Sequence, residues 1–255
     1  MRSFGFVTTL LLLFQIFATA GNGAASEMPF SPGERLTFKV RWTVIPAGDV
    51  TLEVFPDKRI KGKPCHHFIM KAKTTRFADY FYKVRDRIDS YAEKEMKRAV
   101  LYRKRKEGKS KRDVTVDFDW QRQQVVYSNF GRKGSPVDIR PGTFDPLSVF
   151  YAFRNMKLSP GKVLTLYVSD GKKIVLGTAK VLTREKIDAC GKVYDSFLVE
   201  PALEHLGGVF EKSRDAKLRI WVTADEKKIP VRIESEVMVG SFVAELIRHE
   251  QVKIK

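Results

Sequence analysis

Hydrophobic and polar side chains alternate with a period of two residues along most of this chain. The strictest example is Val114–Trp120, in which valine, phenylalanine and tryptophan occupy every second position and aspartate or threonine the positions between. Successive side chains of an extended strand point to opposite faces of a sheet. The alternation therefore predicts a strand with one buried face and one solvated face.

Short alternating segments follow one another, separated by turn-forming residues such as Pro46-Ala47-Gly48 and Glu107-Gly108-Lys109. Long segments with a period of 3.6 residues, which the crossover helices of a parallel sheet require, do not occur in the sequence. The pattern predicts an antiparallel meander. The expected strands are 34–43, 49–55, 67–73, 99–106, 114–120, 124–129, 163–168, 173–183, 193–200, 217–223, 231–239 and 243–253.

Two short helices interrupt this pattern. In Phe144–Arg154, Asp145 is an N-cap candidate, Pro146 suits the first helical position, and apolar residues recur at helical spacing. We expect this helix to cover an opening in the sheet. Thr75–Tyr82, which is rich in aromatic residues, is a second candidate. For both segments, core packing is favoured over a role in holding a cofactor.

These elements together predict a mainly β fold, consisting of an antiparallel, strongly curved sheet or a partly open β-barrel with one or two short helices. Residues 30–255 are numerous enough for one large β domain. A faint repeat relates Gly62–Lys94 to Asp188–Lys227, because each begins with a turn containing cysteine and glycine and ends after a strand in an acidic turn with lysine. The alternative is therefore a domain made of two similar halves.

The N-terminus has the features of an export signal. Arg2 precedes an apolar run, and Ala18-Thr19-Ala20 fits the rule of small residues at a cleavage site. We predict a signal peptide at residues 1–20, a linker at 21–29 and a periplasmic mature protein. The apolar run of about 15 residues is shorter than the roughly 20 that span a bilayer, so no stable transmembrane anchor is expected.

The chain is strongly basic, with 47 Lys and Arg against 30 Asp and Glu, a formal net charge of +17. Such a charge attracts polyanions. Export removes nucleic acid as the natural partner and leaves anionic lipid, lipopolysaccharide or acidic polysaccharide. The densest cluster, here named the basic hairpin, is the candidate ligand-binding site, with simple solvation as the alternative. It comprises Arg103, Lys104, Arg105, Lys106, Lys109, Lys111 and Arg112.

Cys65 and Cys190 are the only cysteines. In an oxidising compartment they could form a disulfide, and two separate thiols are the alternative.

No catalytic, metal-binding or cofactor-binding signature occurs, and we expect no cofactor. The four histidines, His66, His67, His205 and His249, lack the spacings of a zinc site. A carboxylate pair for polysaccharide hydrolysis remains an alternative. The acids considered for it are Asp86, Asp89, Asp117 and Asp119.

The sequence resembles the exported bacterial proteins of domain-of-unknown-function family 3108. The likeness is carried in the family's order by Phe30–Leu36 continuing to Leu52, Val84–Tyr91, Asp145–Tyr151, and Ile220–Asp225 continuing to Leu246. It implies an exported β-rich protein of undefined activity and transfers no catalytic residues.

We therefore expect a non-enzymatic binding or carrier protein for an anionic or amphiphilic component of the cell envelope. The alternatives are an assembly or structural partner that binds an acidic protein with the same basic surface, and a polysaccharide hydrolase. A continuous apolar cavity inside the fold would favour the carrier, whereas a completely filled interior would argue against it.

Overall fold

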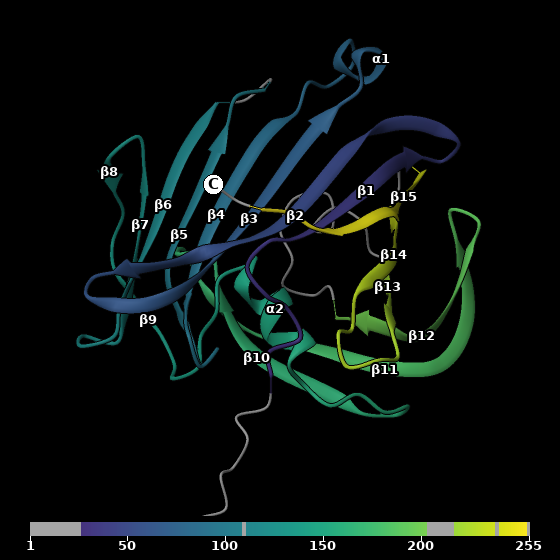
Figure 1. Cartoon of the computed structure of the whole chain (residues 1–255). Helices are drawn as coiled ribbons and strands as arrows, with labels where there is room; N and C mark the ends of the chain where they lie inside the picture. The colour runs from purple at the N-terminus through teal and green to yellow at the C-terminus, as the bar shows by residue number, and fades with distance from the viewer. Residues whose placement is uncertain (1–26, 109–110, 203–216, 238–239, 254–255) are drawn as a thin grey trace, which may run out of the picture.

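In the computed structural model, which describes residues 27–108, 111–202, 217–237 and 240–253, the strands join into one curved antiparallel sheet (Figure 1). The mainly β fold predicted from the alternation is confirmed. The sheet is not closed, since β10 and β8 are the edge strands at the two ends of the order of paired strands. The described strands are β1 (Glu34–Trp42), β2 (Ile45–Ile60), β3 (Lys63–Thr74), β4 (Arg85–Glu93), β5 (Ala99–Lys106), β6 (Arg112–Asp119), β7 (Gln124–Asn129), β8 (Arg132–Lys133), β9 (Val137–Asp138), β10 (Val163–Ser169), β11 (Ile174–Ala189), β12 (Lys192–Pro201), β13 (Lys217–Thr223), β14 (Pro230–Val237) and β15 (Gly240–Gln251). The helices are α1 (Arg76–Asp79) and α2 (Ser148–Arg154).

The sheet consists of two meanders joined side by side. Strands β1 to β8 pair in chain order, with β9 beside β7, and strands β10 to β15 pair in chain order after α2. The last strand, β15, then pairs with the first, so that Phe38 lies opposite Leu246. We call β1–β9 the N-terminal half and β10–β15 the C-terminal half. Figure 1 shows the two halves on either side of α2.

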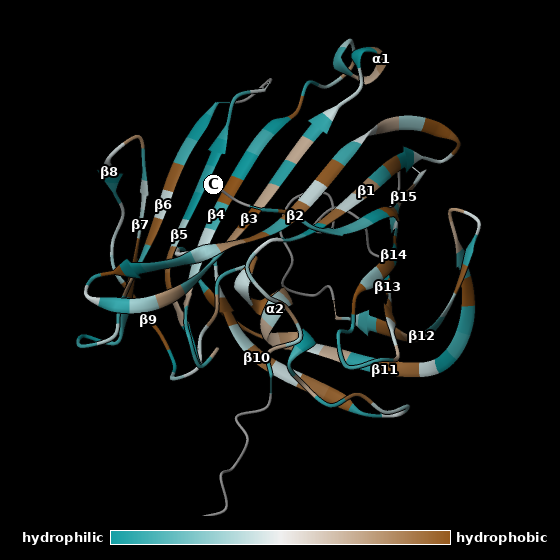
Figure 2. Cartoon of the chain, in the orientation of Figure 1, coloured by the Kyte–Doolittle hydropathy of each residue, from teal (hydrophilic) through white to brown (hydrophobic). Residues whose placement is uncertain are grey.

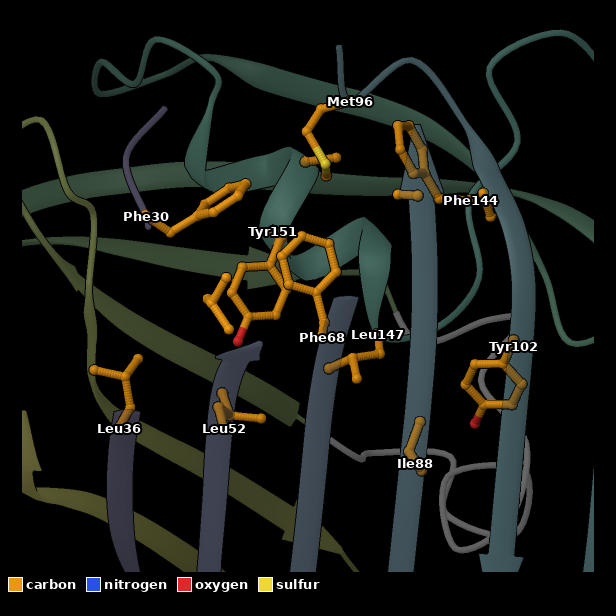
Figure 3. Close-up of a cluster of buried hydrophobic side chains, with 14 of the residues drawn as sticks. Phe30, Leu36, Leu52, Phe68, Ile88, Met96, Tyr102, Phe144, Leu147 and Tyr151 are labelled. Atoms are coloured by element: carbon orange, nitrogen blue, oxygen red, sulfur yellow. The ribbon is translucent and has the colours of Figure 1, made fainter. Parts of the chain in front are cut away.

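The apolar faces of the strands form the concave side of the sheet, on which α2 lies. Along β6, Val114, Val116 and Phe118 are buried, whereas the residues between them are partly exposed. Figure 3 shows one buried side chain from each of the first five strands, with that of Phe68 beside Tyr151 of α2. They are Leu36, Leu52, Phe68, Ile88 and Tyr102.

Side chains fill the concave side of the N-terminal half. Tyr151 of α2 stacks on Phe68 with ring centroids 3.8 Å apart, and Phe30 meets Tyr151 edge to face. The turn between β10 and β11 also packs here. Its Gly171 has a φ of +87°, and a Cβ at this position would lie 2.8 Å from Val116 Cγ1. A larger residue at this turn would therefore combine a strained backbone with a steric clash.

Each half also contains one long hairpin that bends over the convex side. The tip between β2 and β3 reaches across β4 to β6, where Lys61 pairs with Asp117 and Ile60 packs against the cluster around Tyr91. The tip between β11 and β12 is held by a hydrogen bond from Trp221 Nε1 to Glu185, at 2.8 Å. The cysteine-containing turns of the predicted repeat fall at these two tips.

Both predicted helices form, but they are shorter than expected. Helix α2 begins at Ser148 instead of Pro146, and the Asp145 carboxylate accepts hydrogen bonds from the backbone N–H groups of Leu147 and Ser148 at 2.8 and 3.0 Å. In α1, Thr75 caps the first turn by accepting a hydrogen bond from the Ala78 N–H.

The predicted signal peptide, residues 1–20, lies outside the described residues, as does most of the linker. Within the described part of the chain, neither helix has the length and hydrophobicity needed to cross a membrane.

Candidate functional site

An apolar cavity of about 310 Å³ lies between α2 and the concave face of the C-terminal half. Helix α2 provides one wall through Phe150 and Phe153, and strands β10 to β13 provide the other. Each of these strands contributes inward-facing residues such as Leu166, Ala179, Val199 and Ile220. Among the described lining residues, Thr178 is the only one with a polar side chain. The cavity can therefore hold hydrocarbon but offers almost no hydrogen-bonding groups.

Small residues on β11 create this space. Gly177 lies opposite Leu166 in the sheet, and Ala179 lies opposite Leu164. A leucine or phenylalanine at either position would project into the cavity, whereas glycine and alanine leave it open. Below the cavity, Leu164, Val181 and Val199 are almost completely buried and form a packed floor.

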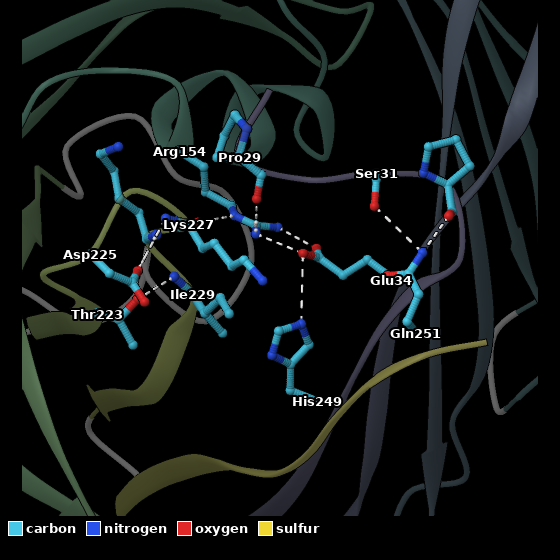
Figure 4. Close-up of polar contacts among 12 residues, drawn as sticks. Pro29, Ser31, Glu34, Arg154, Thr223, Asp225, Lys227, Ile229, His249 and Gln251 are labelled. Carbon is cyan, nitrogen blue, oxygen red and sulfur yellow. Dashed lines mark hydrogen bonds and ion pairs between the residues drawn. The ribbon is translucent and has the colours of Figure 1, made fainter. Parts of the chain in front are cut away.

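A buried ion pair holds the C-terminal end of α2. Arg154 is fully buried, and its guanidinium donates to both carboxylate oxygens of Glu34 on β1, at 2.6 and 3.0 Å (Figure 4). Its remaining donors reach the carbonyls of Lys227 and Pro29, both at 3.0 Å. His249 lies 3.9 Å from Glu34, and burial lowers the pKa of this histidine. Arg154 thus joins α2 to both halves of the sheet.

A second buried network holds the other end of α2. The Asp145 carboxylate accepts hydrogen bonds from Ser90 Oγ on β4 at 2.7 Å and from Ser148 Oγ at 2.6 Å, besides those from the helix backbone. Burial raises the pKa of Asp145. With polar anchors at both ends, α2 is a fixed wall, so the cavity is formed before any ligand arrives.

The cationic side chains of the predicted basic hairpin lie on both faces of the sheet. Arg103 and Arg105 on β5 are exposed on the convex side, whereas Lys104 and Lys106 alternate to the concave side. Burial lowers the pKa of Lys104, and repulsion from Lys106 adds to the effect. Lys111 and Arg112 are exposed at the start of β6, and Lys109 lies outside the described residues. None of the described members lines the apolar cavity.

The disulfide considered for Cys65 and Cys190 is not formed in the structure, where both are free thiols. Cys65 is buried in the cluster of Tyr91 and Val100 under the β2–β3 tip. Cys190 is exposed at the β11–β12 turn, with its thiol 3.7 Å from Glu245. The two cysteines are thus held by different hairpins, one in each half.

The side chains of the adjacent histidines point to opposite faces of the sheet, as the alternation along a strand predicts. His66 packs against Phe30 on the concave side, and burial, together with the charge of Lys94, lowers its pKa. His67 stacks on Tyr91 on the convex side, with Nε2 at 2.9 Å from Asp89. No group of three metal-binding side chains is present among the described residues, and His205 lies outside them.

The four candidate acids of a hydrolase are each engaged by other groups. Burial acts to raise the pKa of Asp89, but hydrogen bonds from His67 and Arg87 outweigh it and lower this pKa. Asp117 pairs with Lys61, and Asp119 accepts backbone N–H groups of its own turn. Asp86 lies on the concave side, 3.8 Å from Lys106. The structure therefore does not bring two of these carboxylates together as a pair that could act jointly in hydrolysis.

Sequence reasoning did not identify the cavity. Its only local signal is Gly177-Thr178-Ala179, a run of small residues inside a predicted strand. A run of this kind marks a place where little side chain fills the core, but it does not show which element lies opposite.

The fold and the cavity define a class, the open, barrel-like antiparallel β proteins. A solved structure of this class is a beta-barrel-like protein of domain of unknown function DUF1849 from Brucella abortus, with a TM-score of 0.51 at 10% identity over 87% of this chain and 98% of that chain. This likeness shows the fold alone. A protein with a YmcC-like fold from Bacteroides fragilis aligns with a TM-score of 0.40 at 9% identity over 88% of this chain and 98% of that chain.

The chain belongs to the DUF3108 family, described as proteins of unknown function, whose model matches residues 37–247. The family indicated by the sequence is thereby confirmed, whereas export stays a prediction. No curated protein matches the chain.

Proposed function

We propose that this chain is a non-enzymatic binding or carrier protein of the bacterial cell envelope, exported to the periplasm, whose ligand is an anionic amphiphile. The observation that carries this proposal is the apolar cavity beneath α2. Its volume lies at the lower end of the roughly 300–1,000 Å³ typical of small-molecule sites. A single hydrocarbon chain is an occupant of suitable size and chemistry.

The composition of the cavity wall decides which part of the ligand lies inside. An unpaired polar group moved from water into such surroundings costs about 1–3 kcal/mol or more. Thr178, the one polar residue among the described lining residues, lies on the same face of the sheet as exposed Thr165 and opposite to Ala179, so no described side chain of the lining can satisfy a charged head group. The hydrocarbon part therefore lies under α2 and the head group remains at the mouth in water. The net charge of +17 favours an anionic head group over a cationic one.

Binding of a single-chain anionic lipid tests this proposal. We expect the mature protein to bind lysophosphatidylglycerol below its micelle concentration, in isothermal titration calorimetry and in native mass spectrometry. Ala179→Phe places a ring in the cavity, and we expect it to weaken binding at least about tenfold, which is roughly 1.4 kcal/mol. Retained circular dichroism and thermal unfolding would show that the variant folds.

Thr165→Phe is the matched control. Thr165 is exposed on β10 in the same β10–β11 hairpin and does not line the cavity, so the same added ring leaves the cavity open. We expect wild-type affinity for this variant. Absence of binding by the wild-type protein, or equal affinity of the wild-type and Ala179→Phe proteins, would contradict the proposed site.

A further inference from the structure

Exposed apolar side chains gather at one edge of the N-terminal half. Of the twelve large hydrophobic side chains that are exposed in the described part of the chain, eight lie in the loops of this edge, here named the apolar rim. Tyr80 is 89% exposed and Val44 81%. The eight are Trp42, Val44 and Ile45 at the β1–β2 turn and its adjoining strand ends, Phe77, Tyr80, Phe81 and Tyr82 in and after α1, and Phe130 between β7 and β8.

Hydrogen bonds hold these loops next to one another. The Thr75 N–H donates to the Ala47 carbonyl at 3.0 Å and joins the α1 loop to the start of β2, beside the β1–β2 turn. The Glu107 N–H donates to the backbone carbonyl of Arg85 at 2.9 Å and joins the β5–β6 hairpin to the start of β4, beside the α1 loop. The Phe130 N–H donates to the backbone carbonyl of Asp113, also at 2.9 Å, and joins that hairpin to the β7–β8 turn. The rim is therefore one continuous edge, at the top of Figure 1.

Figure 2 shows hydrophobic residues in the β1–β2 turn at this edge, although a turn normally carries polar residues. Large apolar side chains on loop tips gain nothing from water, and a group of them marks an interaction surface. The rim lies outside the cavity under α2, because none of its eight residues lines that cavity.

Cations flank the apolar side chains. In the described part of these loops and of the adjoining strand ends, exposed Lys and Arg residues outnumber the exposed acids. Asp79 is already paired with Arg85, and the exposed acids are Glu107 and Asp113. The exposed cations include Lys73, Arg76, Lys83, Lys111, Arg112, Arg132 and Lys133.

We propose that the apolar rim is a membrane-docking surface, which inserts its aromatic tips among the head groups of an anionic phospholipid bilayer. Aromatic rings favour the interface between head groups and hydrocarbon, and Lys and Arg beside them attract anionic lipid. A protein partner would need a matched apolar surface, whereas a fluid bilayer receives separate loop tips without one. This inference goes beyond the ligand cavity and does not depend on it.

Sedimentation with vesicles of phosphatidylglycerol and phosphatidylcholine, against pure phosphatidylcholine, tests the docking surface. We expect the mature protein to prefer the anionic vesicles, with binding that falls as salt rises. Phe77→Ser combined with Phe81→Ser should weaken binding at least about tenfold. Lys111→Glu combined with Arg112→Glu should weaken it at least about 25-fold, since each cation near the surface contributes roughly a factor of five and the two new glutamates repel anionic lipid.

Matched changes elsewhere provide the controls. Leu176→Ser with Val163→Ser removes two exposed apolar side chains from the β10–β11 hairpin, and Lys180→Glu with Lys186→Glu reverses two exposed charges on β11. We expect both control proteins to bind anionic vesicles like the wild type, and circular dichroism should be native for all four variants.

Depth of insertion gives an independent readout. Tyr80→Trp should be quenched by brominated lipid in anionic vesicles, whereas Leu176→Trp should not. The inference is overturned if the wild type does not bind anionic vesicles, or if the rim and control variants lose binding equally. A concentration-dependent dimer that is abolished by the rim variants, without vesicle binding, would assign the surface to a second copy of the chain instead.

Discussion

At the scale of single residues, His66 and His67 show how a strand gives neighbours opposite surroundings. His66 is 3% exposed, lies between Phe30 and Phe68, and has Nε2 at 3.1 Å from the Lys94 carbonyl. His67 instead meets a carboxylate on the other face. Burial and the charge of Lys94 beside Nδ1 favour the neutral ring of His66. They outweigh Asp57, 3.2 Å from Nδ1, and the hydrogen bond to the Lys94 carbonyl, which act in the opposite direction.

The lowered pKa of His66 makes the protein less stable in mild acid. The unfolded chain binds a proton near the ordinary value of about 6.5, whereas the folded protein resists protonation. The contribution of neutral His66 is therefore present above pH 6.5 and is lost as the pH falls below it, by at most about 1.4 kcal/mol per pH unit. Urea unfolding at pH 7.5 and 5.5 measures this loss.

His66→Gln should reduce the difference between the two pH values. His249, whose pKa is also lowered by burial, contributes with the same sign, so His249→Gln should reduce the difference further. Equal pH dependence of the wild-type and His66→Gln proteins would show that His66 titrates normally in the folded state.

At the scale of elements, α2 depends on its anchors more than on its own length. A helix of seven residues is not stable in isolation, because the first turn is costly to form. The Asp145 hydrogen bonds and the Arg154 ion pair compensate by tying the helix to β4 and β1. The shape of the ligand cavity therefore depends on two polar contacts outside its lining.

Glu34→Gln should destabilise the protein by about 3–5 kcal/mol, because it leaves the buried guanidinium of Arg154 without its counter-charge. Glu34→Leu combined with Arg154→Met should recover much of this loss, since no buried charge remains. Asp195→Asn is the control, because it breaks an ion pair with Arg184 whose side chains are 47% and 56% exposed. We expect this change to leave the free energy of unfolding in urea close to that of the wild type, because solvent screens an exposed pair. Equal effects of the two single substitutions would contradict the structural role of the buried pair.

At the scale of the whole molecule, the pairing of β15 with β1 makes one sheet from two meanders. Phe38 and Leu246 lie opposite each other although they are separated by most of the chain. The contact closes a long loop, and loop closure costs entropy that only the completed sheet offsets. We infer that the two halves fold as one cooperative unit.

Deletion of residues 240–255 tests this cooperativity, because it removes β15 and leaves β14 and β1 with unpaired edges. We expect the shortened protein to lose its cooperative thermal transition and to become sensitive to protease in both halves. Deletion of residues 253–255 alone, after the hydrogen bond from Val252 to Gly33, should leave the transition unchanged. A cooperative transition of wild-type midpoint in the 240–255 deletion would show that the halves fold independently.

Much of the architecture was predictable because it is local. The bounds of β5, β7 and β13 agree with the alternation. Asp145 accepts backbone N–H groups at the start of α2, although Leu147 and not Asp145 occupies the N-cap position. Strands β2 and β11 are longer than predicted, since their far ends are mostly exposed and carry no alternating apolar face that would mark them as strands. The basic hairpin was located correctly as a hairpin, but its cations divide between two faces, and its role in binding remains a prediction.

The sequence by itself determined most of the strands, the apolar face of each and the turns between them, because side-chain alternation is a property of the extended backbone and needs no distant partner; β4, β8 and β9 were not among the expected strands. Only the tertiary structure decided that β15 completes the sheet against β1, that Arg154 meets Glu34 across 120 residues, and that Gly177 and Ala179 leave a cavity opposite α2. It alone brought the aromatic loops into one rim. These features depend on contacts between residues far apart in the chain, and such contacts leave no periodic signal in the order of amino acids.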